Sequence, residues 1–174
     1  FVAVSVYFQY AGSGGIAGPQ VGLVTAGNGN FTGTGDVSGR LSSNSLQLRS
    51  SNGTVTTAAS AVSLVTGNWY ELSYSVERTS TSGQFNASVA VYNSSNAGVQ
   101  GSMVDSLSGT FTNATLWADS SVFAAIRENT SIVNLDNFAA QQGVAAVPEP
   151  ASCAAMAGVV LLGFAAGRRR RGGR

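Results

Sequence analysis

The chain has no histidine, no lysine and a single cysteine among its 174 residues. Without histidine, the base of Ser-His-Asp and Cys-His catalysis is missing, so both of these enzyme classes are excluded. Zinc and iron sites depend mainly on histidine and cysteine ligands, and they are excluded for the same reason. The single cysteine, Cys153, lies in an apolar run near the C-terminus. Residues 1–147 therefore cannot form an internal disulfide.

Charge is also scarce, because only 10% of the residues are Asp, Glu, Lys or Arg. Residues 1–147 carry four arginines and seven acids, 4 − 7 = −3, whereas the remainder carries five arginines and one glutamate, 5 − 1 = +4. The basic character of the whole chain therefore belongs to its C-terminus. A mildly acidic body without lysine has no electrostatic footprint for nucleic acid, and we expect no nucleic-acid partner.

The C-terminus combines a rigid break, an uncharged apolar run and a block of arginines. The break is Val147, Pro148, Glu149 and Pro150, the run is 151–167, and the block is Arg168, Arg169, Arg170 and Arg171. As a helix the run covers about 25 Å, at the short limit for a bilayer core of about 30 Å. Arginines stay on the cytoplasmic side, which would leave the rest of the chain outside. The pattern predicts a transmembrane helix over 151–167; a buried helix with a basic tail would explain neither the prolines nor the arginine block.

These three parts, in this order, resemble the PEP-CTERM sorting signal of bacterial proteins associated with exopolysaccharide. The resemblance covers about 27 of the 174 residues. It implies recognition of the motif Val147–Pro150 by an exosortase, a membrane cysteine protease that acts near Pro-Glu-Pro. The arginines Arg168–Arg171 would then fix orientation, and the tail would be a temporary anchor in the inner membrane. A permanent anchor is the alternative, and it differs only in whether the tail is kept.

Short apolar segments alternate with Gly, Asn and Ser turns before residue 140, which favours an all-β sandwich or barrel. The stretch 69–78 has the clearest period of two, with Tyr70, Leu72, Tyr74 and Val76 on one face. The segment 85–91 continues this pattern after a turn and predicts an antiparallel hairpin. We expect the other strands at 2–10, 20–25, 31–34, 46–49, 61–65, 108–112, 116–117, 121–126 and 132–138, with a hairpin turn at Asn52-Gly53.

The turn Gly67–Tyr70 and a closing strand that ends Leu135–Phe138 resemble the concanavalin A/laminin-G-like jelly roll. The resemblance implies an antiparallel sandwich over 1–140, followed by a linker at 141–147 and the sorting segment 148–174. Many domains of this kind bind glycans and some cleave them, but a fold does not fix a function. Because the chain starts at Phe1 without a secretory signal, we expect it to be a fragment of an exported protein.

Jelly-roll glycosidases need two carboxylates on either side of the scissile bond. The closest pair, Glu71 and Glu77, lies six residues apart on the expected outward face of one strand, which corresponds to about 20 Å. This distance exceeds the spacing of about 6.5–9.5 Å in inverting enzymes. We therefore expect both acids to be solvated and the protein not to be an enzyme, with a degenerate glycoside hydrolase as an open alternative.

Glycans are commonly held by stacking on an aromatic ring, and the candidate contacts are Trp69, Tyr70 and Trp117. The competing interpretation places these large aromatics in the core. Calcium would need several convergent carboxylates. The acids Asp36, Asp105, Asp119 and Asp136 are isolated in sequence, so we expect no cofactor and leave Ca²⁺ open.

The sequence thus predicts an exported bacterial surface or matrix protein, sorted through its C-terminus and associated with extracellular polysaccharide. Its expected partners are an exosortase-like membrane protease, the membrane during sorting, and the polysaccharide. A glycan-binding, lectin-like module is the main alternative for the body.

Overall fold

The computed structural model describes residues 1–12, 17–25, 30–42, 45–51, 53–58, 61–128 and 133–143. A compact unit spans Phe1–Gly143, and within its described residues one short helix accompanies ten strands. The predicted membrane helix, the Pro-Glu-Pro motif and the arginine block lie outside the described residues.

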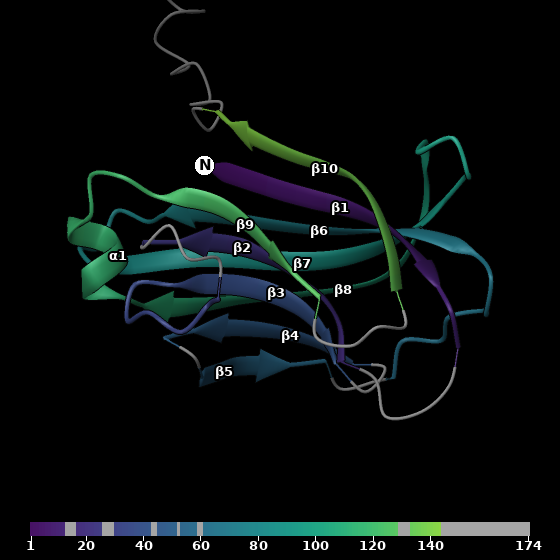
Figure 1. The fold of residues 1–174 in the computed structure, drawn as a ribbon. Helices are drawn as coiled ribbons and strands as arrows, with labels where there is room; N and C mark the ends of the chain where they lie inside the picture. Colours follow the sequence, from purple (N-terminus) through teal and green to yellow (C-terminus); the bar gives the residue numbers. More distant parts are fainter. Residues whose placement is uncertain are drawn as a thin grey trace, which may run out of the picture. The chain divides into compact units, whose positions relative to one another are not determined.

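Two five-stranded antiparallel sheets face each other as a sandwich (Figure 1). The first sheet, in spatial order, contains β10 (Val133–Gln142), β1 (Val2–Tyr10), β6 (Trp69–Arg78), β7 (Gln84–Ser94) and β8 (Gln100–Thr112). The second contains β5 (Gly53–Thr57), β4 (Ser45–Ser50), β3 (Val37–Ser42), β2 (Ala17–Val24) and β9 (Phe123–Arg127). Helix α1 (Ala114–Ala118) connects β8 to β9 at one end of the sandwich. The all-β class with two antiparallel sheets is therefore confirmed.

The core lies between the sheets and is built from alternate residues of their strands. On β6, Tyr70, Leu72, Tyr74 and Val76 are all at most 5% exposed, as the period of two predicts. The inner residues of β3 and β4, Val37, Leu41, Leu46 and Leu48, meet them from the opposite sheet. Each buried side chain of this size contributes about 1.5–3 kcal/mol, so this double layer dominates the stability of the body.

The predicted strand at 31–34 is wrong, because this segment is a loop that crosses the outer face of the second sheet. Phe31 adopts a positive φ of 52° and is 3% exposed against Val24 and Ala125. The carboxylate of Asp36 holds the loop by accepting hydrogen bonds from the backbone N–H groups of Thr25 (2.9 Å) and Gly33 (2.7 Å). The next residues form β3, which the sequence pattern did not reveal.

Two further predicted strands have a different conformation. The segment 61–65 is irregular, and its apolar pattern reflects Val62, which is 2% exposed in the core, and Leu64, which is partly buried against the core. The segment 116–117 belongs to α1, whose N-cap is Asn113: its Oδ1 accepts a hydrogen bond from the N–H of Leu116 at 2.9 Å. A side-chain cap of this kind satisfies a donor that the first helical turn leaves free, and it favours helix over strand locally.

Strands β1 and β10 join the two ends of the body. Val2 pairs with Gln142, and the N–H of Gly143 donates to the carbonyl of Phe1 at 3.2 Å. Asn137 has a positive φ of 48° in β10, close to an irregularity in the pairing at Ser5 and Tyr7. Asparagine tolerates this backbone region better than most residues. Residues 141 and 142 of the expected linker are thus strand, and the jelly-roll type of the sandwich stays a prediction.

Tyr74 provides a test of the core. Its hydroxyl is buried and has no hydrogen-bond partner among the described residues, and burial raises its pKa. A buried unsatisfied hydroxyl costs about 1–3 kcal/mol, so Tyr74→Phe should raise the free energy of unfolding by about 1 kcal/mol in urea titrations.

The matched control is Tyr70→Phe on the same strand, since the hydroxyl of Tyr70 accepts a hydrogen bond from the N–H of Val65 at 2.8 Å. This variant should lose about 1 kcal/mol. A loss of similar size in Tyr74→Phe would contradict the unsatisfied hydroxyl.

Candidate functional site

The three aromatic residues that the sequence offers for glycan contact lie in three different environments. Tyr70 is 2% exposed, and its ring lies 5.7 Å from that of Phe8 in the core. It has almost no surface with which to contact a ligand. Trp69 is half-buried on the outer face of the first sheet, and Trp117 is half-buried on α1. The structure therefore does not bring the three together.

Trp117 is part of a structural cap at the α1 end of the sandwich. Its ring meets Phe85 edge-on at 5.7 Å between centroids, and the guanidinium carbon of Arg78 lies 4.8 Å from the ring centroid. Arg78 also donates to the carbonyl of Trp117 at 2.9 Å. Because Trp69 and Arg78 are the two ends of β6, Trp69 is about 30 Å from this cap.

The outer face of the first sheet gathers polar and aromatic side chains around Glu71, and we call it the Glu71 face. Glu71 of β6 pairs with Tyr7 of β1 on one side and with Tyr92 of β7 on the other. In the next row Trp69 pairs with Gln9 and Ser94. Paired residues of neighbouring strands point to the same face, so three aromatic rings surround one carboxylate.

Glu71 is buried, which corrects the expectation that it is solvated. Its exposed fraction is 6%, and its Oε2 accepts a hydrogen bond from Nε2 of Gln100 at 2.9 Å. The pKa of Tyr7 is raised by burial, by the negative charge of Glu71 and by a hydrogen bond to the Glu71 carboxylate. A polar group removed from water needs such donors, and Gln100 supplies one to Glu71. Glu77, farther along β6, is half-buried.

The β7–β8 hairpin bends toward β10 at the end of the sandwich where Glu71 lies (Figure 1). The β7–β8 pairing shifts register on both sides of Tyr92, and bulges of this kind bend a strand pair. At the tip, Gly98 has a φ of +72°, and a Cβ there would lie 2.9 Å from Nδ2 of Asn137. The positive φ favours glycine, and the short distance to Asn137 shows that the tip lies against β10. Gln100, at the start of β8, is thereby placed over Glu71.

The chemistry available on the Glu71 face is hydrogen bonding and stacking. Glu71 and Glu77 lie on one strand, about 20 Å apart by strand rise, which is too far for a pair of catalytic carboxylates. Asp36 holds a loop, and among the described residues no three acids or cysteines lie close enough together to hold a metal ion. Sequence reasoning missed Tyr7, Tyr92 and Gln100, because only the strand register brings them to Glu71.

Comparison with known proteins identifies the C-terminal segment. Residues 146–171 match the family model described as the PEP-CTERM protein-sorting motif, so the predicted sorting signal is confirmed. No curated protein matches the chain. None of the helices in the described part of the chain has the length and apolarity needed to cross a bilayer.

Among solved structures, the chain is similar to a protein of unknown function from Shewanella oneidensis MR-1. The sequence identity is 14% and the TM-score is 0.38. The match covers 83% of this chain and 61% of the other chain. The match thus spans less than two thirds of the Shewanella chain.

Titration of Tyr7 tests the Glu71 face. In Glu71→Gln the carboxylate charge disappears, so the pKa of Tyr7 should fall toward the ordinary value of a tyrosine, about 10. Phenolate absorbance against pH measures this, with Tyr7→Phe subtracted to isolate the one residue. The control is Glu77→Gln, six positions along the same strand, which should leave the titration of Tyr7 unchanged.

The same contact has a consequence for stability. The folded state holds the Tyr7 proton more tightly than the unfolded state does, and this difference contributes to the free energy of unfolding. The contribution is complete below about pH 10 and is lost as the pH rises through the pKa of Tyr7 in the folded state. Glu71→Gln should weaken that alkaline loss in unfolding measurements. An unchanged Tyr7 titration in Glu71→Gln would show that the two side chains do not interact.

Proposed function

We propose that this chain is an exported bacterial surface or matrix protein whose C-terminus is recognised, and then removed, by an exosortase-like membrane protease. The observation that carries the proposal is the sorting motif at residues 146–171 directly after the compact unit Phe1–Gly143. In this proposal the segment 151–167 holds the chain in the inner membrane as a helix. Arg168–Arg171 keep the C-terminal end of that segment on the cytoplasmic side. The body is then delivered to the cell surface or the extracellular matrix.

The end of the sandwich supports processing near the Pro-Glu-Pro motif. Strand β10 ends at Gln142, and the last hydrogen bond of the sheet is the one from Gly143 to Phe1. A cut near Pro148–Pro150 would therefore leave all the described strands intact. The released body would keep the core that the described residues form.

In this proposal the body is non-catalytic, of concanavalin A-like type, and associates with extracellular polysaccharide. A lectin-like role is the second candidate, and the Glu71 face favours it. Trp69, Tyr7 and Tyr92 offer rings for stacking, and Gln100 and Glu71 place polar atoms beside them. Carbohydrate rings pair an apolar face with polar edges, and aromatic residues with a polar neighbour suit them.

The sorting role is tested by replacing Arg168–Arg171 with glutamine. Without the positive block the tail loses its orientation signal, so the chain should be missorted. The amount of processed protein should fall at least about tenfold, which corresponds to a free-energy difference of about 1.4 kcal/mol. Cell fractionation followed by intact mass of each fraction measures the outcome.

The matched control is Arg174→Gln, an arginine of the same tail outside the block. The wild-type chain should yield a released form that ends near Pro148–Pro150. A wild-type chain found only at full length in membranes would mean a permanent anchor and would sink the processing step. Unchanged sorting of the variant would sink the role of the arginines.

The lectin-like role is tested by Trp69→Ala. Removing a central aromatic contact costs about 1.4 kcal/mol or more, so binding of the polysaccharide secreted by the producing cells should weaken at least about tenfold. The control is Phe123→Ala, which removes a 51% exposed aromatic from the opposite sheet. Equal affinity of both variants, measured by co-sedimentation, would remove the Glu71 face from the binding mechanism.

A further inference from the structure

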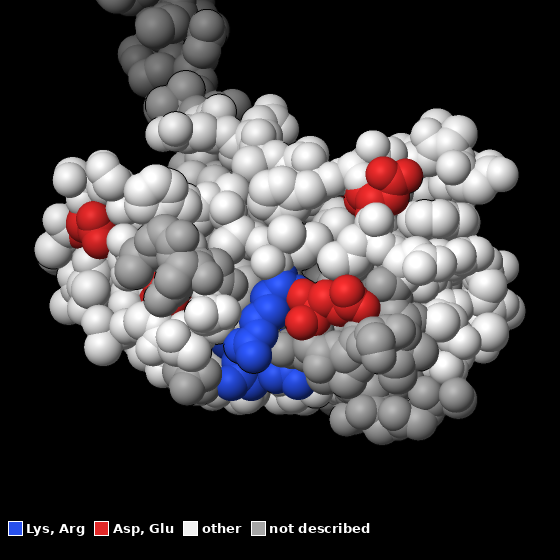
Figure 2. Space-filling view, in the orientation of Figure 1, with Lys and Arg blue, Asp and Glu red and all other residues white. Residues whose placement is uncertain are grey.

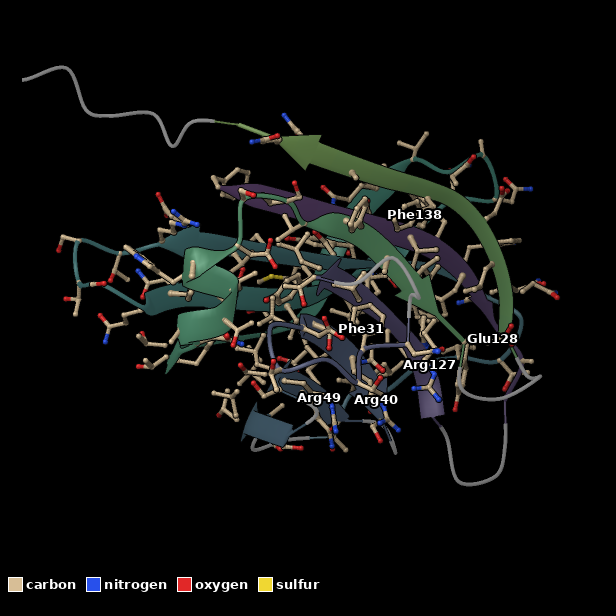
Figure 3. All side chains as sticks on the ribbon, turned by 60° about the vertical axis from the view of Figure 1, so that its left-hand side comes forward. Phe31, Arg40, Arg49, Arg127, Glu128 and Phe138 are labelled. Atoms are coloured by element: carbon tan, nitrogen blue, oxygen red, sulfur yellow. The ribbon has the colours of Figure 1, made fainter. Side chains whose placement is uncertain are left out.

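Three of the four arginines of the body gather on one face of the sandwich. Arg40 of β3, Arg49 of β4 and Arg127 of β9 lie on the outer face of the second sheet, and we call this group the arginine patch. Figure 2 shows it as one continuous blue area, and Figure 3 shows the three side chains beside one another. The sequence gives no hint of it, because the three positions are far apart along the chain.

Strand register explains the gathering. Gln20 of β2 pairs with Arg40 on one side and with Arg127 on the other, so these two Cα atoms are two strand spacings, about 10 Å, apart. Arg49 pairs with Ser38, two residues before Arg40 on the same strand, which makes Arg49 and Arg40 diagonal neighbours. Diagonal neighbours of this length are within reach of each other.

Neutral groups hold the arginine patch in place. Nη1 of Arg127 donates to the carbonyl of Asn30 at 3.0 Å, and Nη1 of Arg49 donates to Oε1 of Gln47 and Oγ1 of Thr54, both at 3.3 Å. Phe31, buried beside Asn30, keeps that carbonyl in position from the adjacent loop.

The floor of the arginine patch is polar although it is buried. Gln20 is 4% exposed and Ser38 is 2% exposed, and Nε2 of Gln20 donates to Oγ of Ser38 at 2.7 Å. Above them, Nε of Arg40 is buried and has no hydrogen-bond partner within the described residues. The pKa of Arg40 is lowered by burial, and then by the positive charges of Arg49 and Arg127. An anion at this place would relieve the repulsion among the three guanidinium groups.

The arginine patch is positive on a body that is otherwise negative. Glu128 follows Arg127 in the chain and lies close to it in Figure 3, so the patch carries 3 − 1 = +2. The rest of the body has Arg78 against six acids, 1 − 6 = −5. This separation of charge lets a polyanion approach one face and repels it from the others. Guanidinium groups bind carboxylates in bidentate pairs, which suits several of them in a row.

We propose that the arginine patch binds an acidic polysaccharide through carboxylates of its uronic acid units. This rests on the proposed function in one respect, namely that the body reaches the extracellular side, where such polymers occur. Three charges at neighbouring strand positions favour a linear polymer over a single anion, because several weak pairs add along one chain. The arginine patch lies on the opposite sheet from the Glu71 face, so the two faces are separate surfaces.

The test uses the full chain in detergent with Arg168–Arg171 and Arg174 changed to glutamine, because the tail arginines would bind polyanions themselves. In this background, polygalacturonate should bind, and its affinity should fall as salt is raised. Uncharged dextran should not bind. The double change Arg49→Gln with Arg127→Gln should weaken polygalacturonate binding about a hundredfold, a factor of ten for each charge pair.

Two controls separate charge from fold. Arg78→Gln removes the fourth arginine of the body and should leave the affinity unchanged, while Arg49→Lys with Arg127→Lys should retain part of it. The far-ultraviolet circular dichroism of all variants should match that of the parent. If the double glutamine variant unfolds, the single variant Arg49→Gln, with an expected tenfold loss, decides the matter.

Several outcomes would overturn the proposal. Absence of polygalacturonate binding would do so directly, and so would equal binding of dextran. Binding of dextran sulfate without binding of polygalacturonate would show that the arginine patch recognises sulfate groups and not carboxylates. Equal affinity for duplex DNA would show a general anion surface. None of these results changes the sorting of the chain, and failure of the Arg168–Arg171 experiment leaves this binding measurement intact.

Discussion

The body depends on burial of the inner face of β6. This strand lies in the middle of the first sheet, and its four inner side chains fill the space between the sheets. That burial fixes how β6 pairs with its two neighbouring strands. A shift of the pairing by one residue would turn Tyr70 and Tyr74 outward and Glu71 and Ser73 inward. The register of β1 and β7 against β6 therefore follows from the core. The residue rows of the Glu71 face follow from that register.

The pairing of β1 with β10 extends this constraint to the chain ends. Once β1 is fixed beside β6, its free edge is available to the last strand, and the pairing runs from Val2 with Gln142 to Tyr10 with Val133. The last described strand therefore ends at Gln142, before the sorting motif begins at residue 146. A protease acting in that motif would cut after the last described strand. The fold and the proposed processing are compatible because the last strand is an edge strand.

The sequence predicted best where one face of a strand is buried and the other is polar. Strands β1 and β6 were predicted with their observed bounds, because alternation along them is unbroken. Prediction from the sequence failed where the backbone conformation depends on a side-chain hydrogen bond rather than on strand pairing. Asp36 fixes the loop at 31–34 through Thr25, 11 residues away. Asn113 caps α1 through Leu116, a local contact that a search for alternating apolar residues does not detect. The sorting motif was recognised from the sequence because its information is local and linear.

The candidate surfaces were hidden from the sequence for a physical reason. Residues on the outer faces do not pack in the core, so their types do not follow a simple apolar pattern. Only the pairing register of the strands decides which of them are neighbours. Glu71 was expected in solvent since its strand position is outward, yet Gln100, from the distant start of β8, covers it. Likewise, Arg40 and Arg127 are 87 residues apart in sequence but flank the same glutamine.

The two outer faces of the sandwich thus carry different chemistry on one shared core. The Glu71 face pairs a buried acid with aromatic rings and amides, whereas the arginine patch gathers positive charge above a polar floor. A polyanion is repelled by Glu71 and attracted by the arginines, so a single acidic polymer cannot prefer both faces. If both bind polysaccharide, they must bind different parts or different polymers, and a body with two such faces would cross-link the matrix around it. That property requires the two faces to point in opposite directions, which a two-layer sandwich provides.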